Sequence, residues 1–291
     1  MNDSCLHPDG YCIRPFQTNA ELHAAEQLQR DVWGCPDLEI VHHLEMKAVI
    51  AAGGVVIGAF APGQNGDTLI GFVYSFIGRE QGEFTLHSHM AAVLPAWRDR
   101  QVGLRLKLAQ RRGALEMGIK KISWTYDPLQ SRNAHFNFAR LGVVARKYLV
   151  DFYGADTAIL VPGIGTDRFW AEWNLLDPRV MDKAEQPQHA AACDIPARAI
   201  PLVEMTVDGA PELQVENMAA LGGTGEPAQS LLIAIPRDIA AVQAGDARLA
   251  RAWRDATREA FVTALDAGYA VRDFARGAAH GVYLLDRPAS S

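Results

Sequence analysis

Residues 87–106 read HSHMAAVLPAWRDRQVGLRL, and this stretch decides the fold. An apolar strand pattern ends at Pro95 in a polar loop, and a helical pattern begins at Val102. Residues 95–112 carry one acid, Asp99, against six bases: Arg98, Arg100, Arg105, Lys107, Arg111 and Arg112. Positive charge beside a helix N-terminus, whose first N–H groups have no intrahelical partner, favours a bound pyrophosphate. Gly103 lets such a ligand approach the backbone without meeting a Cβ.

Short apolar strands alternate with amphipathic helices on both sides of this stretch. The patterns predict strands over residues 11–16, 55–60, 68–77, 84–94, 120–126 and 143–148. They predict helices over residues 20–32, 42–51, 102–117 and 131–141, with Asn19 as the first N-cap. Turns are expected at residues 62–67, at Gly118 and at Gly142. This order indicates an α/β (α+β) sandwich in which helices flank a mixed sheet.

The loop also resembles a known motif. The run Arg98-x-x-Gln101-x-Gly103 is similar to motif A of the GNAT superfamily of N-acetyltransferases, which reads Arg/Gln-x-x-Gly-x-Gly/Ala before a helix. Gln101 stands where the family usually has its first glycine. A second landmark, Asn133-Ala134 followed by Leu141-Gly142, resembles the family's helix along the pantetheine arm. The similarity covers residues 11–160, and residues 127–134 with the His-Ser-His-Met run resemble a little-characterised prokaryotic branch of predicted acetyltransferases.

The resemblance implies that acetyl-CoA lies between the strand ending at Val93 and the strand ending near Tyr126. Backbone groups that would pair with pantetheine belong to Ala91, Ala92 and Val93. Amides that would bind the pyrophosphate belong to Asp99, Arg100, Gln101, Val102, Gly103 and Leu104. The guanidinium groups of Arg98, Arg100 or Arg105 would meet the phosphates, and Asn133 would contact the cofactor arm. The alternative interpretation is that the basic helix is an ordinary solvated face.

Two histidines precede the loop. His87 and His89 point to one side of a strand because side chains alternate. Amine acetylation needs a neutral amine, and a histidine with a pKa of about 6.5 suits the removal of its proton. The run His-x-His-x-x-Ala-Val is similar to that of arylalkylamine N-acetyltransferases, where the paired histidines lie in the acceptor cleft. The alternatives are two inert strand histidines, or a metal pair that lacks a third ligand at a recognisable spacing.

The thiolate that leaves in this family is often protonated by a tyrosine, and here Phe138 stands at its place. Tyr126, Tyr148 and Tyr153 are the substitutes that the sequence offers, although tyrosines at strand ends often serve packing alone. A thiolate with a pKa of about 8.5 can also leave without an acid. A backbone N–H near Val93 would stabilise the oxyanion.

The C-terminal part has a different composition. Residues 177–211 are rich in Pro, Ala and Gln, which predicts an irregular connection over residues 161–210. Residues 211–291 predict an α/β subdomain with strands at 230–235, 269–274 and 282–285 and a helix at 246–267. The arginines of that helix, including Arg254 and Arg258, are expected outside its apolar stripe. The strand-helix-strand order resembles motif A, which indicates either a degenerate half-repeat or a plain appended subdomain.

Composition excludes several classes of protein. Among 291 residues, 34 acids against 28 bases give a net charge of −6, which argues against nucleic-acid binding. The longest nearly apolar stretch, residues 48–61, contains three glycines and is too short for a membrane span. No signal peptide is expected at the N-terminus. Four scattered cysteines (Cys5, Cys12, Cys35 and Cys193) predict neither disulfides nor a zinc site, in keeping with a cytoplasmic protein.

These patterns together predict an enzyme that transfers the acetyl group of acetyl-CoA to an amine by direct attack in a ternary complex. The acceptor is a small molecule or a peptide, no metal is expected, and a homo-oligomer is compatible with the sequence. The acids Asp37, Glu39 and Glu45, with His42 and His43, fall in the region expected to face the acceptor. Two alternatives stay open: an acyl-CoA-binding or regulatory module without turnover, and a transferase of longer acyl groups or to oxygen.

Overall fold

The computed structural model describes residues 7, 9–63, 66–154, 163–187, 193–222 and 228–287. They group into two compact units: unit 1 holds residues 1–124 and 174–176, and unit 2 holds residues 125–173 and 177–291. The division at residue 124 differs from the predicted domain limits at 160 and 210, which stay predictions about the extent of the acetyltransferase domain. Outside the described residues lie residues 1–6 and 8 of the N-terminus, Cys5 among them, and residues 64–65 of the predicted turn.

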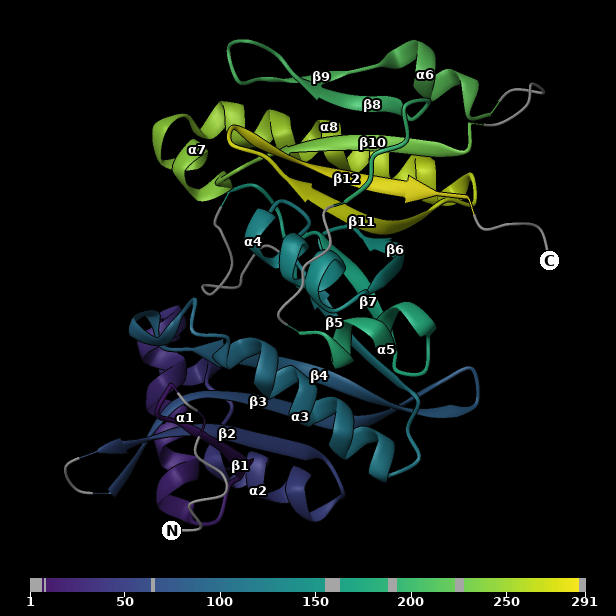
Figure 1. The fold of residues 1–291 in the computed structure, drawn as a ribbon. Coiled ribbons are helices and arrows are strands. Elements are labelled where there is room, and N and C mark those ends of the chain that lie inside the picture. Colours follow the sequence, from purple (N-terminus) through teal and green to yellow (C-terminus); the bar gives the residue numbers. More distant parts are fainter. Residues whose placement is uncertain are drawn as a thin grey trace. The chain divides into compact units, whose positions relative to one another are not determined.

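Unit 1 is a sheet with helices on both faces (Figure 1). Its strands are β1 (Cys12–Pro15), β2 (Val55–Gly63), β3 (Gly66–Glu80), β4 (Glu83–Val93) and β5 (Lys121–Tyr126). They lie in the order β1-β2-β3-β4-β5, antiparallel except for the parallel pair β4 and β5. The helices are α1 (Asn19–Trp33), α2 (His43–Ala51) and α3 (Val102–Glu116), with short 3₁₀ turns η2 (Asp37–Glu39) and η3 (Pro95–Trp97).

The two faces of this sheet form separate cores. Helices α1 and α2 pack on the face that carries Phe72 and Tyr74, whereas Val102 and Leu106 of α3 pack on the opposite face with Val73. The sequence pattern predicts the helices and strands of unit 1 to within a few residues of their observed ends. The N-cap of α1 is Thr18 rather than Asn19, because Thr18 and Glu21 form a capping box that satisfies two backbone N–H groups.

Strand β4 is interrupted by a bulge. Tyr74 of β3 pairs with Met90, but the next residue, Ser75, pairs with Ser88, which leaves His89 as the extra residue. On its other side β4 pairs with β5 at two positions, Leu86 with Ile122 and His87 with Ser123. Among the described residues of unit 1, no strand pairs with that edge of β4 after His87, so six residues of the strand keep one free edge.

Unit 2 is also built of hydrogen-bonded β-strands and helices (Figure 1). Its strands are β6 (Val144–Leu149), β7 (Arg168–Asn174), β8 (Ile200–Met205), β9 (Pro211–Leu213), β10 (Ser230–Pro236), β11 (Ala270–Arg276) and β12 (His280–Asp286), in the order β7-β6-β11-β12-β10-β8-β9. Its helices are α4 (Ser131–Ala134), α5 (Pro178–Glu185), α6 (Val215–Ala220), α7 (Ile239–Gly245) and α8 (Ala247–Asp266). Strands β8 and β10 are parallel, and the other strand pairs described for unit 2 are antiparallel.

The helix predicted at residues 131–141 changes type along its length. The α-helical turn Ser131–Ala134 continues as a π-helix over His135–Arg140 (η4), in which each N–H bonds a carbonyl five residues earlier. Phe138 is fully buried on this π-helix, and Gly142 ends it with a φ of 75°. The predicted C-terminal glycine is therefore confirmed, while the helix type was outside what periodicity can tell.

The irregular connection predicted over residues 161–210 is wrong. Residues 161–210 instead include the regular elements β7, α5 and β8. Pro178 is the first residue of α5, behind the N-cap Asp177, where proline starts a helix rather than breaking it. Pro201 lies within β8, next to the strand's start. The prolines therefore mark the edges of elements here and not a linker.

The strand-helix-strand match predicted between residues 230 and 274 is also wrong. The stretch of unit 1 that resembles motif A, β4-α3-β5, joins two neighbouring parallel strands. Strand β10 instead has β12 and β8 as neighbours, and β12 separates it from β11. Among the described strands of unit 2, the parallel neighbours joined through a helix are β8 and β10, with β9 and α6 between them in the chain. None of the helices that the structure describes is long and apolar enough to cross a membrane.

Candidate functional site

The turn from β4 into α3 presents backbone N–H groups. Gln101 is the N-cap of α3, and no side chain caps the helix in the structure. The first intrahelical hydrogen bond joins Arg105 N to Gln101 O at 3.0 Å, so the amides of Val102, Gly103 and Leu104 precede it. The partial positive charge of the helix N-terminus falls on these three amides, which is the arrangement that an anionic ligand needs.

Gln101 takes the backbone conformation that glycine favours. Its φ is 59°, and Asp99 two residues earlier has a φ of 63°. Both lie in the left-handed region, which costs a residue with a side chain roughly 1–2 kcal/mol. Gln101 therefore adopts a left-handed backbone that glycine takes most easily.

A buried tyrosine holds this turn. The hydroxyl of Tyr11 donates a hydrogen bond to Arg100 O at 3.1 Å, and the Tyr11 ring packs edge-on against Trp97 at 6.3 Å. The guanidinium of Arg100 lies 4.9 Å from the centroid of the Trp97 ring. Tyr11 is fully buried just before β1, and nothing in its local spacing marks it as part of a site 89 residues away.

Substitution of Tyr11 by phenylalanine is expected to loosen the turn. The lost hydrogen bond should lower the free energy of unfolding by about 1 kcal/mol and raise the rate of amide hydrogen exchange at residues 100–103. Tyr269→Phe is the matched control, because it removes a similar bond from Tyr269 to Ala228 O in unit 2. Equal exchange rates at residues 100–103 in both variants would contradict a role for Tyr11 in holding the turn.

The six bases of residues 95–112 differ in their burial and in their partners. Lys107 is buried, donates hydrogen bonds to Ser88 Oγ and Gln110 Oε1 at 2.9 Å each, and lies 3.8 Å from the centroid of the Trp124 ring. Burial lowers the pKa of Lys107 to about 7. Arg111 donates to Leu175 O at 2.8 Å. Lys107 therefore lies on the inner face of α3, because it falls in the helical period of the buried residues around it.

The bases nearest the turn are three arginines. Arg98 and Arg100 are exposed, and Arg105 is half-buried. These are the residues that the sequence assigned to phosphate contacts, and they are the bases of this stretch nearest the amides of residues 102–104 in the chain. The solvated-face interpretation therefore holds for part of α3 only.

His87 and His89 both lie beside the ring of Phe76. Their ring centroids are 5.1 Å and 5.8 Å from that of Phe76, and 6.3 Å from each other. His87 is half-buried, with its Nδ1 3.4 Å from Ser123 Oγ, and His89 is exposed, with its ring 6.0 Å from that of Tyr74. Both rings thus lie beside Phe76, as alternation along a regular strand predicts, although the bulge at His89 interrupts that alternation.

The surroundings hold both histidines neutral. Burial lowers the pKa of His87 to about 4, with further lowering from His89 and Lys107 and an opposing effect from Glu80. Desolvation also lowers the pKa of His89, against the nearby charge of Glu45. The ordinary value near 6.5 assumed from the sequence therefore does not apply to His87, which is a weaker base than an exposed histidine.

The backbone of residues 91–93 lines the free edge of β4. Ala91 pairs with Val73, Ala92 with Phe72 and Val93 with Gly71 on the β3 side only. The peptide groups on the other edge are those that the resemblance assigns to the pantetheine arm. A free strand edge offers N–H and C=O groups to an extended amide-bearing ligand in the way that a neighbouring strand would.

The tyrosines proposed as acids lie in unit 2. Tyr126 is buried, its hydroxyl is 3.4 Å from that of Tyr283, and burial raises the pKa of Tyr126 well above its usual value. Tyr153 is 40% exposed, and its hydroxyl lies 2.9 Å from Thr125 Oγ1. Asn133 is exposed on α4. Of these two tyrosines, Tyr153 is the one exposed to solvent.

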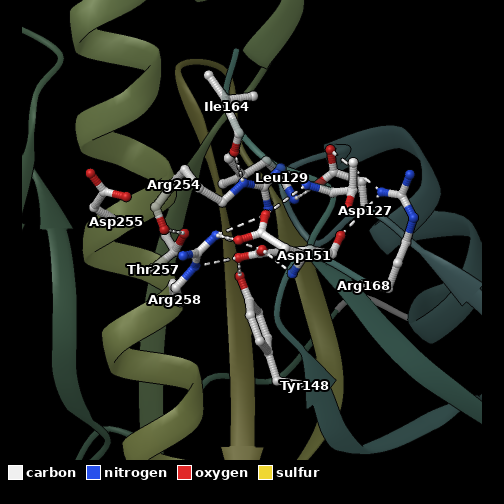
Figure 2. Close-up of polar contacts among 12 residues, drawn as sticks. Asp127, Leu129, Tyr148, Asp151, Ile164, Arg168, Arg254, Asp255, Thr257 and Arg258 are labelled. Carbon is white, nitrogen blue, oxygen red and sulfur yellow. Dashed lines mark hydrogen bonds and ion pairs between the residues drawn. The ribbon is translucent and has the colours of Figure 1, made fainter. Parts of the chain in front are cut away.

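Tyr148 belongs to an ion-pair network that the sequence did not reveal (Figure 2). Its hydroxyl donates to Asp167 Oδ2 at 2.6 Å, and burial raises the pKa of Tyr148 well above its usual value. Arg258 also bonds Asp167, at 2.7 Å, and lies 3.3 Å from a carboxylate oxygen of Asp151. These contacts give Tyr148 a structural role, and an acid role for any of the three tyrosines stays a prediction.

The same network corrects the expectation for α8. Arg254 was expected outside the apolar stripe, but it is fully buried. Its Nη2 lies 2.7 Å from Asp127 Oδ1, and its Nε donates to Ile164 O at 3.0 Å. The helix can bury this charge because a carboxylate 127 residues earlier in the chain neutralises it.

The acids of the predicted acceptor region have separate partners. Asp37 pairs with Arg30 at 2.8 Å on the surface. Glu45 on α2 accepts a hydrogen bond from the hydroxyl of Tyr74 at 2.9 Å, and that ring is the neighbour of His89. Burial, and then the contact with Glu45, raises the pKa of the Tyr74 hydroxyl well above its usual value, so the phenol stays protonated.

Comparison with known proteins gives matches of structure alone. No family model matches the chain, and no curated protein matches it. Similar structures include the NatC complex bound to Gag peptide and CoA, at 12% identity and a TM-score of 0.47, over 57% of this chain and 99% of that chain. Arabidopsis thaliana NAA60 with a bisubstrate analogue follows at 17% and 0.45, over 56% of this chain and 97% of its own.

A Desulfovibrio desulfuricans protein assigned to the GNAT family matches at 16% identity and a TM-score of 0.45, over 57% of this chain and 99% of its own. The chain is thus longer than these proteins, each of which it spans almost completely. These matches cover little more than half of this chain.

Proposed function

We propose that this chain is a GNAT-type N-acetyltransferase that moves the acetyl group of acetyl-CoA to an amine. The observation that carries the proposal is the uncapped N-terminus of α3 in unit 1, reached through a left-handed turn that follows the free edge of β4. The amides of residues 102–104 would bind the diphosphate, and Arg98, Arg100 and Arg105 would add charge. The edge of residues 91–93 would pair with the pantetheine arm.

Gly103 supports the proposed ligand. A Cβ built on Gly103 would meet no protein atom closer than Val93 Cγ2, at 3.7 Å, which is ordinary van der Waals contact. Its φ is not in the left-handed region, so neither packing nor backbone conformation requires glycine here. Gly103 leaves the backbone at the N-terminus of α3 open, which is what a bound diphosphate would require.

The reaction follows from the two neutral histidines. The acceptor amine loses a proton to His89, the exposed ring, and His87 behind it serves as relay. The amine nitrogen then attacks the thioester carbonyl, a backbone N–H near Val93 stabilises the oxyanion, and the C–S bond breaks as the amide forms. The nitrogen loses its second proton as the amide forms, and water delivers this proton to the thiolate. An acid role for Tyr153 stays a prediction. Asn133 as a contact to the cofactor arm and a cytoplasmic location stay predictions.

Replacement of Gly103 by alanine tests the binding mode. The added methyl group should weaken CoA binding by about tenfold or more, because it occupies the side from which the diphosphate approaches. Stability should stay the same or rise by about 0.5–1 kcal/mol, since alanine is the better helix former. Isothermal titration calorimetry measures the affinity, and thermal unfolding measures the stability.

Gly113→Ala is the matched control on the same helix. A Cβ at Gly113 would also meet only ordinary contacts, with Val55 at 3.8 Å, but Gly113 lies far from the turn in the helix. CoA affinity should not change in this variant. Absence of binding heat with the wild-type chain at millimolar CoA, or equal affinity in Gly103→Ala, would contradict the proposed site.

A binding or regulatory module without turnover is the second candidate. It is favoured by Phe138, which is fully buried where the family places its tyrosine, and by Gln101 in the turn. A thiol-release assay across a panel of amines separates the two candidates, because only the transferase consumes acetyl-CoA in proportion to acceptor. Competing acyl-CoAs and alcohols in the same assay test transfer of longer acyl groups or transfer to oxygen.

A further inference from the structure

Three side chains that ligate metals meet where α1 and α2 come together in unit 1. His23 and Glu26 lie one turn apart on α1, and His43 is the first residue of α2. The Nδ1 of His43 is 2.7 Å from Glu26 Oε1, and the Nδ1 of His23 is 3.4 Å from Glu26 Oε2. One potential ligand atom from each of the three residues lies within 4.8 Å of the other two.

The cluster is partly buried and held in place. The side chains of Glu26 and His43 are 12% and 16% exposed, whereas His23 is 55% exposed and open to solvent. Glu26 Oε1 also accepts a hydrogen bond from the backbone N–H of His43 at 2.7 Å. A ligand set with two ordered members and one accessible member suits a metal site that fills from solution.

The imidazole rings are close to one another. The ring centroids of His23 and His43 are 3.7 Å apart, and those of His42 and His43 are 4.1 Å apart. The Nε2 of His42 lies 3.6 Å from Glu26 Oε1. The Glu26 carboxylate thus faces three imidazole rings, whereas a single ion pair would need only one of them. A cation between these groups would accept lone pairs from the imidazole nitrogens and compensate the charge of the carboxylate.

We propose that His23, Glu26 and His43 bind a divalent transition-metal ion of the Zn²⁺, Co²⁺ or Ni²⁺ class. Two imidazole nitrogens and one carboxylate oxygen are a donor set that Zn²⁺ accepts, and it leaves a fourth position for water or a ligand. Hard ions such as Mg²⁺ and Ca²⁺ prefer oxygen donors and are not expected here. His42 lies beside this site and is the candidate for the fourth position.

The site would connect α1 to α2. The ligands come from positions 17 and 20 residues apart, so an ion between them would fix the start of α2 against α1. Two residues after His43, α2 carries Glu45, which binds the hydroxyl of Tyr74. The ion would therefore order the helix that borders the face of β4 where His89 lies. The proposed metal site is formed by residues of unit 1 alone and does not depend on the proposed acetyltransferase activity.

Cobalt and zinc titrations of the chelator-treated full chain test the proposal. One equivalent of Co²⁺ should bind and give visible d–d absorption bands, and Zn²⁺ should displace it in the same stoichiometry. His23→Ala and Glu26→Gln should each lower the affinity by about tenfold or more, as losses around metal sites commonly do. His23 is exposed, so its variant is expected to fold, and far-UV circular dichroism checks this for both.

His280→Ala is the control, because it removes a histidine from β12 in unit 2 and should leave affinity and spectrum unchanged. The proposal is overturned if the wild-type chain takes up no stoichiometric Co²⁺ or Zn²⁺. It is equally overturned if His23→Ala and Glu26→Gln keep the wild-type affinity and absorption bands, because uptake would then belong to other residues.

Discussion

Replacement of Arg254 by methionine is expected to lower the free energy of unfolding by about 3–5 kcal/mol. Methionine keeps much of the packing volume but removes the charge that neutralises Asp127, which is 8% exposed. Asp127 would keep Arg168 as a charged neighbour at 4.0 Å, in place of the 2.7 Å contact with Arg254. Figure 2 shows the two arginines on either side of this carboxylate. Urea unfolding measures the difference.

Two further variants separate the buried charge from the helix position. Arg251→Met on the same helix removes a 51% exposed arginine, paired with Asp255 at 3.5 Å, and should cost less than about 1 kcal/mol. Asp127→Asn added to Arg254→Met should recover part of the loss, because it removes the uncompensated carboxylate. If Arg254→Met costs no more than Arg251→Met, the network does not stabilise the fold as its geometry indicates.

Removal of both histidines is expected to have the largest effect on activity. His87→Ala combined with His89→Ala should lower kcat/KM for amine acetylation by about 100-fold or more, which is the usual contribution of a general base. CoA affinity should stay unchanged, since the proposed diphosphate site lies in the turn at residues 98–105. Steady-state kinetics with an amine found in the panel, and calorimetry with CoA, measure the two effects.

The pH profile gives this prediction a second readout. Protonation of a histidine base stops catalysis as the pH falls through its pKa in the folded chain. Because burial lowers the pKa of His87 to about 4 and that of His89 is also lowered, the acidic limb of kcat/KM should lie below pH 6.5. His89→Gln should remove this limb. Full activity in the double variant would exclude both residues from the mechanism.

Local periodicity predicted most of unit 1. The helix expected at residues 102–117 is observed at Val102–Glu116, because apolar residues recur at helical spacing and Gly118 takes the left-handed conformation that ends it. Strand β7 in unit 2 shows the same kind of signal. Phe169, Ala171 and Trp173 alternate with more exposed residues, so β7 was predictable. The prolines that follow it are also typical of a linker, and this is why the sequence predicts one there.

The candidate site was predictable only where its residues are neighbours in the sequence. The basic turn and the His-x-His strand lie within about 20 residues, and a resemblance to a family motif was visible there. The hydrogen bond from Tyr11 to Arg100 spans 89 residues, and the ion pair of Arg254 with Asp127 spans 127. No spacing rule joins such partners, because their contact is a product of the folded sheet and not of a local pattern.

The bulge in β4 also divides that strand into two segments that can change independently. Residues before His89 keep one phase relative to β3, and residues from Met90 onward keep the other. Deletion of His89 would leave Ser88 opposite Ser75 and Met90 opposite Tyr74, so both segments would keep their sides and the strand would become regular. A change of length at the bulge therefore alters the extra side chain that the strand presents there and leaves the pairs on both sides of it intact.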